Sequence, residues 1–345
     1  MAEKKTEKKA QTPLHALGGS PPARSAEQRW VLASQGILTE LYNANHLRMG
    51  GMPRPLCANF GALFLRRDWG VKSRAGAIAC IESLLEEGHR HAFAESLGCD
   101  PQEICAWDYV RASAVAGWAY LAYHLEADEA WRFMVEAARK LSESYGSWRE
   151  VADAYLRARV LWSSGGEAEL GPKIAKLLAP GGGWDFPWAI DLSGEIPPAV
   201  EPLDERIVDK AGGEGVFTTI KAAMSAVVAA DRCARITVRA GHYPESVTIR
   251  FPVELVADGA VTIESHEGAP IVSHKQNALL RGLTLVSGKS EEGEAMQGVF
   301  HEGFHLKLEA CTIRSARCGV YALTKNAFLV MEKCTIESAA ASGIL

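Results

Sequence analysis

The four-residue unit Thr262-Ile-Glu-Ser265 recurs in the last third of the 345-residue chain as Thr284-Leu-Val-Ser287, Thr312-Ile-Arg-Ser315 and Thr335-Ile-Glu-Ser338. The units start 22, 28 and 23 residues apart, and the longest interval contains the polar insertion Gly288-Lys-Ser-Glu-Glu-Gly-Glu294. A period near 22 residues built from short strands is typical of units that stack on their neighbours. Because side chains alternate along a strand, the second residue of each unit should point inward and the first and third outward. The repeat therefore predicts a parallel β-helix whose core ladder is Ile263, Leu285, Ile313 and Ile336.

Two further rows support the same spacing. One consists of Gly298-Val299, Gly319-Val320 and Gly343-Ile344. In the other, the segment from Leu306 to Cys311 aligns with the segment from Leu329 to Cys334. In this alignment the thiols of Cys311 and Cys334 stack as reduced, interior side chains and form no disulfide.

The entry to this region carries a resemblance. Gly215-Val-Phe-Thr-Thr-Ile220 and Ile236-Thr-Val-Arg-Ala-Gly-His-Tyr-Pro-Glu-Ser-Val247 resemble the opening of right-handed parallel β-helices of the pectin-lyase-like superfamily. The resemblance implies a right-handed solenoid over residues 209–345, with a helix after Thr219 that caps its N-terminal end. Pectinesterase-like members use paired acids and an arginine on adjacent coils, and we find no such pair here. The resemblance nevertheless makes a carbohydrate-active enzyme, with a glycan ligand, the alternative function for this part.

The last residues raise the question of a docking surface. The chain reaches Leu345 in mid-coil, without a polar cap, which would leave apolar core and strand edges open. Either the β-helix is incomplete at this point, or a protein partner or a second copy of the chain covers its end. The partner-binding residues predicted there are Cys334, Ile336, Ile344 and Leu345.

From Ala26 to about Leu178 the apolar residues recur at helical spacing, which predicts an all-α domain over residues 26–190. All nine tryptophans precede residue 189, and large aromatic side chains of this kind usually build a helical core. A box of aromatic residues that holds a cofactor is the alternative. Asp100-Pro-Gln-Glu103 and Ser147 with Glu150 are helix starts, because each places a capping oxygen before a first-turn acid.

Tryptophan-centred motifs in this domain carry a second resemblance. Cys105-Ala-Trp-Asp-Tyr-Val-Arg111, Asp128-Glu-Ala-Trp131, Tyr145-Gly-Ser-Trp148 and Tyr155-Leu-Arg-Ala-Arg159 occur in the order found in the YbeU/YbeR-like bacterial family of unknown function, DUF1266. The resemblance extends over residues 30–190 and implies a compact helical domain, with no established reaction. The family's Tyr-Leu-x-Gly-Arg pattern is altered here, since Ala158 stands at the glycine.

Polar residues within these motifs form the candidate ligand site. Asp108 and Arg111 are three residues apart, and Tyr155 and Arg159 are four apart, so each pair shares a helix face. One interpretation is a buried ion-pair and hydroxyl network that sets how the helices pack. The other is a pocket for a small anion, with Arg111 and Arg159 as its fork. Both interpretations stay open at this stage.

The remaining segments set the boundaries and exclude some classes. Residues 1–25 are rich in Lys, Glu, Gly and Pro and predict a disordered tail, and the proline-containing segment 191–208 predicts a linker. A net charge of −5 gives no indication of nucleic acid as the main partner. Without a secretory segment or a run of 18 apolar residues, we expect a cytoplasmic protein that does not enter a membrane.

No set of residues in the sequence demands catalysis. His89, His91, Cys99 and Cys105 match no standard zinc spacing, so we assign no metal, no cofactor and no catalytic residue. We expect a non-catalytic interaction or scaffold protein that binds a partner, or itself, through the β-helix. The helical family suggests a bacterial conflict or stress system as its setting. Binding of a small anion in the helical domain is the other alternative.

Overall fold

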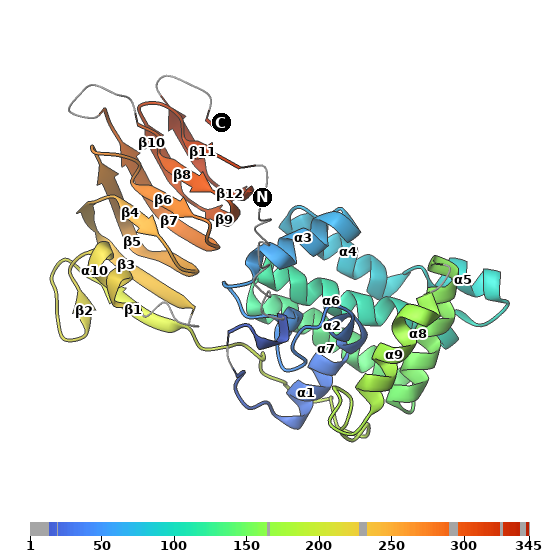
Figure 1. Ribbon diagram of the computed structural model, residues 1–345. Helices are drawn as coiled ribbons and strands as arrows, with labels where there is room; N and C mark the ends of the chain where they lie inside the picture. Colours follow the sequence, from blue (N-terminus) through green and yellow to red (C-terminus); the bar gives the residue numbers. More distant parts are fainter. Residues whose placement is uncertain are drawn as a thin grey trace, which may run out of the picture.

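The structure is a computed structural model that describes residues 14–18, 20–163, 166–227, 233–289, 296–324, 327–338 and 343–344. Helices occupy the first half of the chain and strands the second, and the two halves lie side by side (Figure 1). Residues 1–13 and 19 of the predicted tail, most of the polar insertion and Leu345 fall outside the described residues.

The helical half contains nine labelled α-helices within its described residues. They are α1 (Ala26–Ala33), α2 (Gly36–Leu41), α3 (Ala58–Trp69), α4 (Arg74–Glu86), α5 (Arg90–Leu97), α6 (Ala106–Leu121), α7 (Ala127–Ser144), α8 (Trp148–Trp162) and α9 (Gly166–Leu178). Short 3₁₀ turns are η1 (Leu14–Ala16), η2 (Met49–Gly51) and η3 (Pro101–Ile104). Both predicted helix starts are confirmed: Asp100 and Glu103 form a capping box ahead of α6, and the Ser147 hydroxyl accepts from the Glu150 amide.

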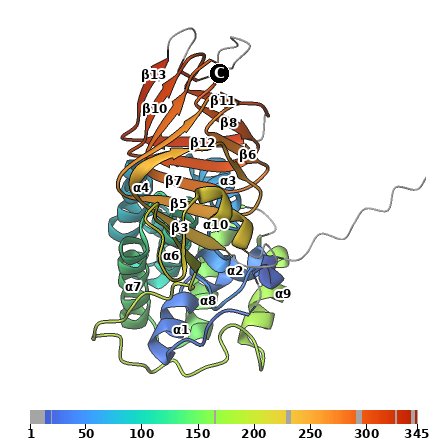
Figure 2. The ribbon, with the colours of Figure 1, turned by 90° about the vertical axis from the view of Figure 1, so that its left-hand side faces the viewer.

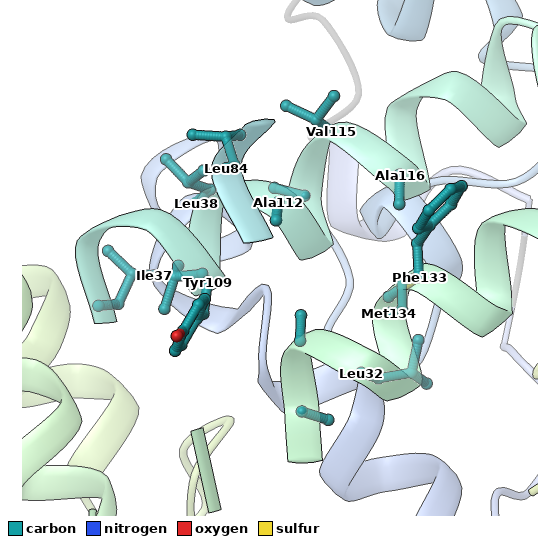
Figure 3. Packing of buried hydrophobic residues seen from close by; sticks show 14 of the residues in the cluster. Leu32, Ile37, Leu38, Leu84, Tyr109, Ala112, Val115, Ala116, Phe133 and Met134 are labelled. Carbon is teal, nitrogen blue, oxygen red and sulfur yellow. The ribbon is translucent and has the colours of Figure 1, made fainter. Parts of the chain in front are cut away.

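Helix α6 is the centre of this half. Every residue from Ala106 to Leu121 is buried, and α6 packs against α3, α4, α7 and α8. A helix that is apolar on most of its circumference needs neighbours on all sides, which the surrounding helices supply. Figure 3 shows the small α6 side chain of Ala116 near Phe133 of α7, with Ala112 one turn earlier on α6. Alanine at these positions lets the helix backbones approach closely.

The second half consists of parallel strands and one helix. The strands are β1 (Asp204–Val208), β2 (Val216–Phe217), β3 (Ala234–Pro244), β4 (Val247–Ile249), β5 (Val253–Ser265), β6 (Ile271–His274), β7 (Ala278–Ser287), β8 (Val299–Glu302), β9 (Phe304–Glu309), β10 (Thr312–Ser315), β11 (Val320–Ala322), β12 (Ala327–Glu332) and β13 (Thr335–Ser338). The helix α10 (Ile220–Ala226) contacts β1 to β4. The strands gather at one end of the helical half (Figure 2).

The register predicted from the repeat is confirmed. Thr262 on β5 pairs with Thr284 on β7, which pairs with Thr312 on β10, and β10 continues to Thr335 on β13. Of the aliphatic ladder, Ile263, Leu285 and Ile313 are fully buried, and Ile336 is partly buried. The other two rows also pair, Val299 with Val320 and Leu306 with Leu329. Matching side chains on neighbouring strands therefore specify the stacking.

The predicted fold class, an all-α domain followed by a right-handed parallel β-helix, is wrong in its second part. The strands form two parallel sheets, one of nine strands and one of four, and the described residues show no closed solenoid. The chain as a whole is a mixture of helices and parallel strands. The repeat specifies which residues stack, but closure of a coil depends on turns and on the surfaces that cover each sheet, and the repeat holds no information about these.

The two halves are joined by buried polar contacts. The Asn277 side-chain amide donates to the Leu56 carbonyl (2.7 Å) and to Asn59 Oδ1 (2.9 Å). Lys307 on β9 is buried and donates to the Tyr123 carbonyl. Buried polar groups need such partners, so these contacts define how the sheet lies against α3 and the end of α6.

The predicted tail and linker also make contacts. His15 lies in the segment predicted as a disordered tail, and its carbonyl accepts from the Asn45 side chain (3.2 Å). Within the segment predicted as a linker, the Ile196 carbonyl accepts from Trp131 Nε1 (2.8 Å) and the Leu192 carbonyl from Arg139 Nε (2.8 Å). Strand β1 lies at the end of the same segment.

Candidate functional site

A cavity of about 600 Å³ lies within the helical half, between α2, the end of α3, α6, α8 and α9. Its walls combine aromatic rings, leucines and a few charged groups. The lining residues are Leu38, Leu41, Tyr42, Asp68, Trp69, His89, Trp107, Arg111, Trp118, Tyr155, Arg159, Trp162 and Leu170. Its volume lies in the range of small-molecule sites. Three of the four residues predicted for the ligand site, Arg111, Tyr155 and Arg159, are among them.

Helical spacing explains how α6 and α8 supply the two main walls. Trp107 and Arg111 are four residues apart on α6, so they lie one above the other on one face. Tyr155, Arg159 and Trp162 follow the spacing i, i+4 and i+7 on α8. The two faces meet where the rings of Trp107 and Tyr155 lie 4.9 Å apart, centroid to centroid.

Arg111 is buried and held on several sides. Its Nε donates to the Trp107 carbonyl (2.9 Å), and Nη2 lies 2.8 Å from both Asp108 Oδ1 and His89 Nδ1. The guanidinium also lies over the ring of Trp107, 4.1 Å from its centroid, and near that of Trp69, at 5.2 Å. Burial lowers the pKa of Arg111 and the Asp108 carboxylate opposes this, although a guanidinium stays charged. Among the described residues no hydrogen bond uses Nη1.

Asp108 lies behind Arg111 and does not line the cavity. Its carboxylate is fully buried and accepts from the backbone amides of His89 (3.0 Å) and Arg90 (2.9 Å). It also pairs with the guanidiniums of Arg90 (3.4 Å) and Arg111 (2.8 Å). With four donors around it, Asp108 holds the guanidinium of Arg111 in place.

Tyr155 is buried, yet its hydroxyl has no hydrogen-bond partner among the described residues. Burial raises the pKa of Tyr155 to about 12, and the nearby charges of Arg111 and Arg159 oppose the rise. The phenol is therefore a neutral hydrogen-bond donor at the cavity wall. The Tyr155 hydroxyl therefore keeps hydrogen-bonding capacity at the cavity wall that no described residue uses.

Arg159 and Trp162 lie toward the outer side of the cavity. Arg159 Nη2 pairs with Glu169 at 3.1 Å, and the Glu169 carboxylate is largely exposed. Trp162 is 56% exposed, an unusual state for the largest apolar side chain. Its ring lies 5.9 Å from His89 and 6.1 Å from Trp107, centroid to centroid.

Tyr42 and Asp68 are cavity residues that no motif in the sequence indicates. The Tyr42 hydroxyl donates to Asp68 Oδ2 (3.1 Å), and Asp68 is paired with Arg67. Burial, together with the Asp68 charge, raises the pKa of Tyr42 to about 12. Both residues precede α6 by about forty residues or more, so no local spacing connects them with it. The tryptophans stand out in the sequence, but large aromatic side chains mainly predict a helical core.

Part of the site lies in a region that matches a known protein family. Residues 96–188 match a family model. Its description is Protein of unknown function (DUF1266). No curated protein matches the chain. The DUF1266 region contains α6 and α8 and so supplies both cavity guanidiniums, Arg111 and Arg159, together with Tyr155. Tyr42, Asp68, Trp69 and His89 come from the chain before the DUF1266 region, so the cavity is completed by residues outside the match.

A second hollow, of about 660 Å³, runs between α7 and residues 194–198. Arg139 on its wall already donates to the carbonyls of Leu192 and Gly194, both at 2.8–2.9 Å. Arg132 and Lys140 line this hollow as well, together with the acidic Asp128, Glu136, Glu143 and Glu195. Its wall therefore carries charges of both signs.

Three of the predicted partner-binding residues lie at the outer strands of the two sheets. Ile336 on β13 pairs with Ile313, and Ile344 bridges to Val320 and is 50% exposed. Cys334 is half-buried beside Cys311, and the interaction of the two thiols lowers the pKa of Cys334 to about 7. Leu345 lies outside the described residues. Partner binding at these positions stays a prediction.

The described residues set two further limits. They contain no group of three His, Cys, Asp or Glu side chains arranged to hold a metal ion. None of their helices has both the length and the apolar character needed to cross a membrane.

Proposed function

We propose that the protein binds a small anionic ligand in the cavity between α6 and α8, where Arg111, Tyr155 and Arg159 meet the anion. The observation that carries this proposal is the Tyr155 hydroxyl at the cavity wall, which has no hydrogen-bond partner among the described residues and lies near both guanidiniums. An anion placed there accepts from the phenol and from Nη1 of Arg111. Hydrogen bonds to charged groups contribute about 1.5–3 kcal/mol each, so two or three of them are enough for specific binding.

The charges around the cavity favour an anion. Arg90 and Arg111 share the single carboxylate of Asp108, which leaves one positive charge without a carboxylate partner. Part of the Arg90 charge is balanced by the last carbonyls of α4, because its guanidinium donates to Leu84 (3.1 Å) and Leu85 (3.4 Å). The remaining positive potential therefore lies on the Arg111 side, toward the cavity.

The arrangement supports binding more than catalysis. Asp108 is the buried carboxylate nearest to Arg111, but its oxygens are already occupied by four donors. The Tyr155 phenol, with its pKa raised to about 12, keeps its proton at neutral pH. Neither Asp108 nor Tyr155 is available as a general base near pH 7, and Nδ1 of His89 on the cavity wall already accepts from the Arg111 guanidinium (2.8 Å).

The test is ligand-dependent thermal stabilisation measured by scanning fluorimetry and isothermal titration, with acetate, inorganic phosphate, benzoate and indole-3-carboxylate as probes. A ligand present at one hundred times its Kd stabilises the folded state by about 2.7 kcal/mol, which is easily measured. We expect at least one probe to stabilise the protein. Replacement of Tyr155 with Phe removes only the hydroxyl and should raise the Kd of that probe by about tenfold or more, because one hydrogen bond to the anion is lost.

Arg159→Leu is the second variant, with Arg157→Leu as its matched control. Arg157 lies on the same helix but pairs with Glu103 on the protein surface and does not line the cavity. We expect Arg159→Leu to remove the stabilisation by the probe while the unliganded protein stays folded, and Arg157→Leu to retain it. Unfolding of Arg159→Leu without any ligand, together with normal binding by Tyr155→Phe, would instead favour a purely structural network.

The remaining expectations from the sequence also stand as proposals. We propose a cytoplasmic location, which rests on the lack of a secretory pattern in the sequence. An interaction role for the half-exposed outer strands, at Ile336 and Ile344, is independent of the cavity and compatible with it.

A further inference from the structure

We infer that the ligand of this cavity is an aromatic monocarboxylate, with its ring against the tryptophan-lined wall and its carboxylate at Arg111, Tyr155 and Arg159. The inference rests on the proposed function and goes further, because it names the chemical class of the ligand. The size of the cavity, the side chains of its walls and the charges around it each restrict the class of ligand.

The cavity is much larger than a bare inorganic anion. A water molecule occupies about 30 Å³ in the liquid, and a carboxylate or phosphate group is only a few times larger. The cavity measures about 600 Å³, so an inorganic anion at Arg111 would leave most of it filled with water against apolar walls. The ligand therefore has an organic body in addition to its charged group.

The walls indicate that this body is aromatic. Six lining residues are Tyr or Trp, whereas three are leucines. The ring of Trp107 meets those of Tyr155 and Trp162 at 52° and 47°, so these rings are tilted and not stacked face to face. One face of Trp107 is covered by the Arg111 guanidinium. The tilted arrangement offers stacked and edge-on positions to an inserted planar ring.

Trp162 adds an independent observation at the outer side. An indole that is 56% exposed beside an aromatic cavity gains burial only if something occupies the space next to it. The neighbouring His89 ring, at 5.9 Å, is also partly exposed. A ligand ring that reaches this position would cover the Trp162 face, whereas a small anion at Arg111 would not.

The charge balance specifies a monoanion. Arg159 is paired with Glu169, and Asp68 on the opposite wall is paired with Arg67. Among the described arginines at the cavity wall and directly behind it, the guanidinium without a full carboxylate partner belongs to the Arg90, Asp108 and Arg111 cluster. A single carboxylate balances this charge, whereas a phosphate dianion would bring an excess negative charge near Asp68.

The experiment is isothermal titration of the full chain with three matched probes: indole-3-carboxylate, cyclohexanecarboxylate, which keeps the charge but lacks the aromatic ring, and indole, which keeps the ring but lacks the charge. We expect indole-3-carboxylate to bind at least about tenfold more tightly than either of the others. Trp162→Leu should weaken indole-3-carboxylate by about fivefold and leave cyclohexanecarboxylate almost unchanged. Val160→Ala, a change of another exposed apolar residue of α8 that does not line the cavity, is the control and should alter neither Kd.

The outcomes separate this inference from the proposed function. Equal binding of cyclohexanecarboxylate and indole-3-carboxylate, abolished by Arg159→Leu, overturns the aromatic class and keeps the anion site. Tight binding of phosphate with no response to Trp162→Leu does the same. If no carboxylate binds at millimolar concentration, or if Arg159→Leu and Tyr155→Phe leave binding unchanged, the proposed function and the inference both fail.

Discussion

The imidazole of His305 on β9 lies parallel to the phenol ring of Tyr123 at the end of α6, with 6.3 Å between the ring centroids and 6° between the planes. Both side chains are buried where the sheets meet the helical half. The ring nitrogens of His305 are enclosed, and the neighbouring groups are His124, His301 and the charged Lys307. This contact joins the two halves through groups that must stay uncharged.

The first prediction concerns acid. Burial lowers the pKa of His305 to about 3 and those of His124 and His301 to about 4, with Lys307 adding to the effect on His305 and His124. Above pH 6.5 these histidines are neutral in both the folded and the unfolded chain, so they add no pH dependence. Below pH 6.5 the unfolded chain binds protons that the folded chain excludes. The free energy of unfolding should therefore fall by about 1.4 kcal/mol per pH unit for each histidine.

Urea denaturation between pH 7.5 and 4.5 tests this slope, with His305→Phe as the variant. The phenylalanine keeps an aromatic ring beside Tyr123 but binds no proton, so the loss of stability between pH 6.5 and 4.5 should be smaller than in the parent chain. His91→Gln, at an exposed position on α5, is the control and should keep the parent slope. An identical slope in all three proteins would show that His305 does not cause the acid sensitivity.

The second prediction concerns Gly88. Its φ is +62°, and a Cβ at this position would lie 2.0 Å from Asp108 Oδ2 and 2.7 Å from Arg90 Nη1. Gly88→Ala should therefore cost backbone strain of about 1 kcal/mol and, in addition, displace the carboxylate that positions Arg111. Gly98→Ala is a matched control, because Gly98 has φ +63° with open space around its Cβ position. Thermal unfolding should show a clearly larger loss for Gly88→Ala; equal losses would mean that only backbone strain acts at Gly88.

The third prediction concerns Glu254 at the junction of the two halves. This fully buried carboxylate pairs with Arg54 (3.3 Å), which lies over the ring of Tyr120, and with Arg235 (2.6 Å). Glu254→Gln leaves Arg54 without this anion and Arg235 with only Glu205, at 3.7 Å, and should cost about 3–5 kcal/mol in the free energy of unfolding. The exposed pair of Arg314 and Glu337 on the sheet surface provides the contrast, so Glu337→Gln should change stability little. A small effect of both variants would show that water screens the junction.

The fourth prediction compares two positions of one ladder. Ile313 is fully buried between Leu285 and Ile336, and its Cγ2 occupies the space where a Cβ at Gly298 would lie. Ile313→Ala should cost about 2–5 kcal/mol, because it removes buried methyl groups and leaves a cavity. Ile336→Ala, at a partly buried rung, should cost less. Chemical denaturation of both variants measures the difference, and a larger loss at Ile336 would contradict the stacking order.

Much of the local structure followed from the sequence. The repeat specified the pairing of Thr262, Thr284, Thr312 and Thr335, because strands align where like side chains match. Capping residues predicted the beginnings of helices at Asp100 and Ser147, since those side chains satisfy backbone amides that no helical carbonyl reaches. Helical spacing also placed Asp108 beside Arg111 on one turn and Tyr155 beside Arg159 on another.

How these helices and strands are arranged in space could not be predicted from the sequence. The repeat predicted a closed β-helix, whereas the structure has two parallel sheets of nine and four strands, because stacking between neighbours leaves turns and closure undetermined. The spacing on α6 could not show that Tyr42 and Asp68, from distant parts of the chain, would face Arg111. Such contacts depend on how whole helices pack against each other.

By itself, the sequence determined short-range features: which residues pair in the ladders, where helices start, and which polar side chains share a helical turn. These follow from local periodicity and backbone hydrogen bonding. Only the tertiary structure decided that Asp108 lies behind Arg111 while the Tyr155 hydroxyl, at a cavity wall, has no hydrogen-bond partner in the described parts of the chain. That outcome depends on the packing of α6 against α8 and on the space left between their aromatic side chains, which arises from many contacts between distant residues.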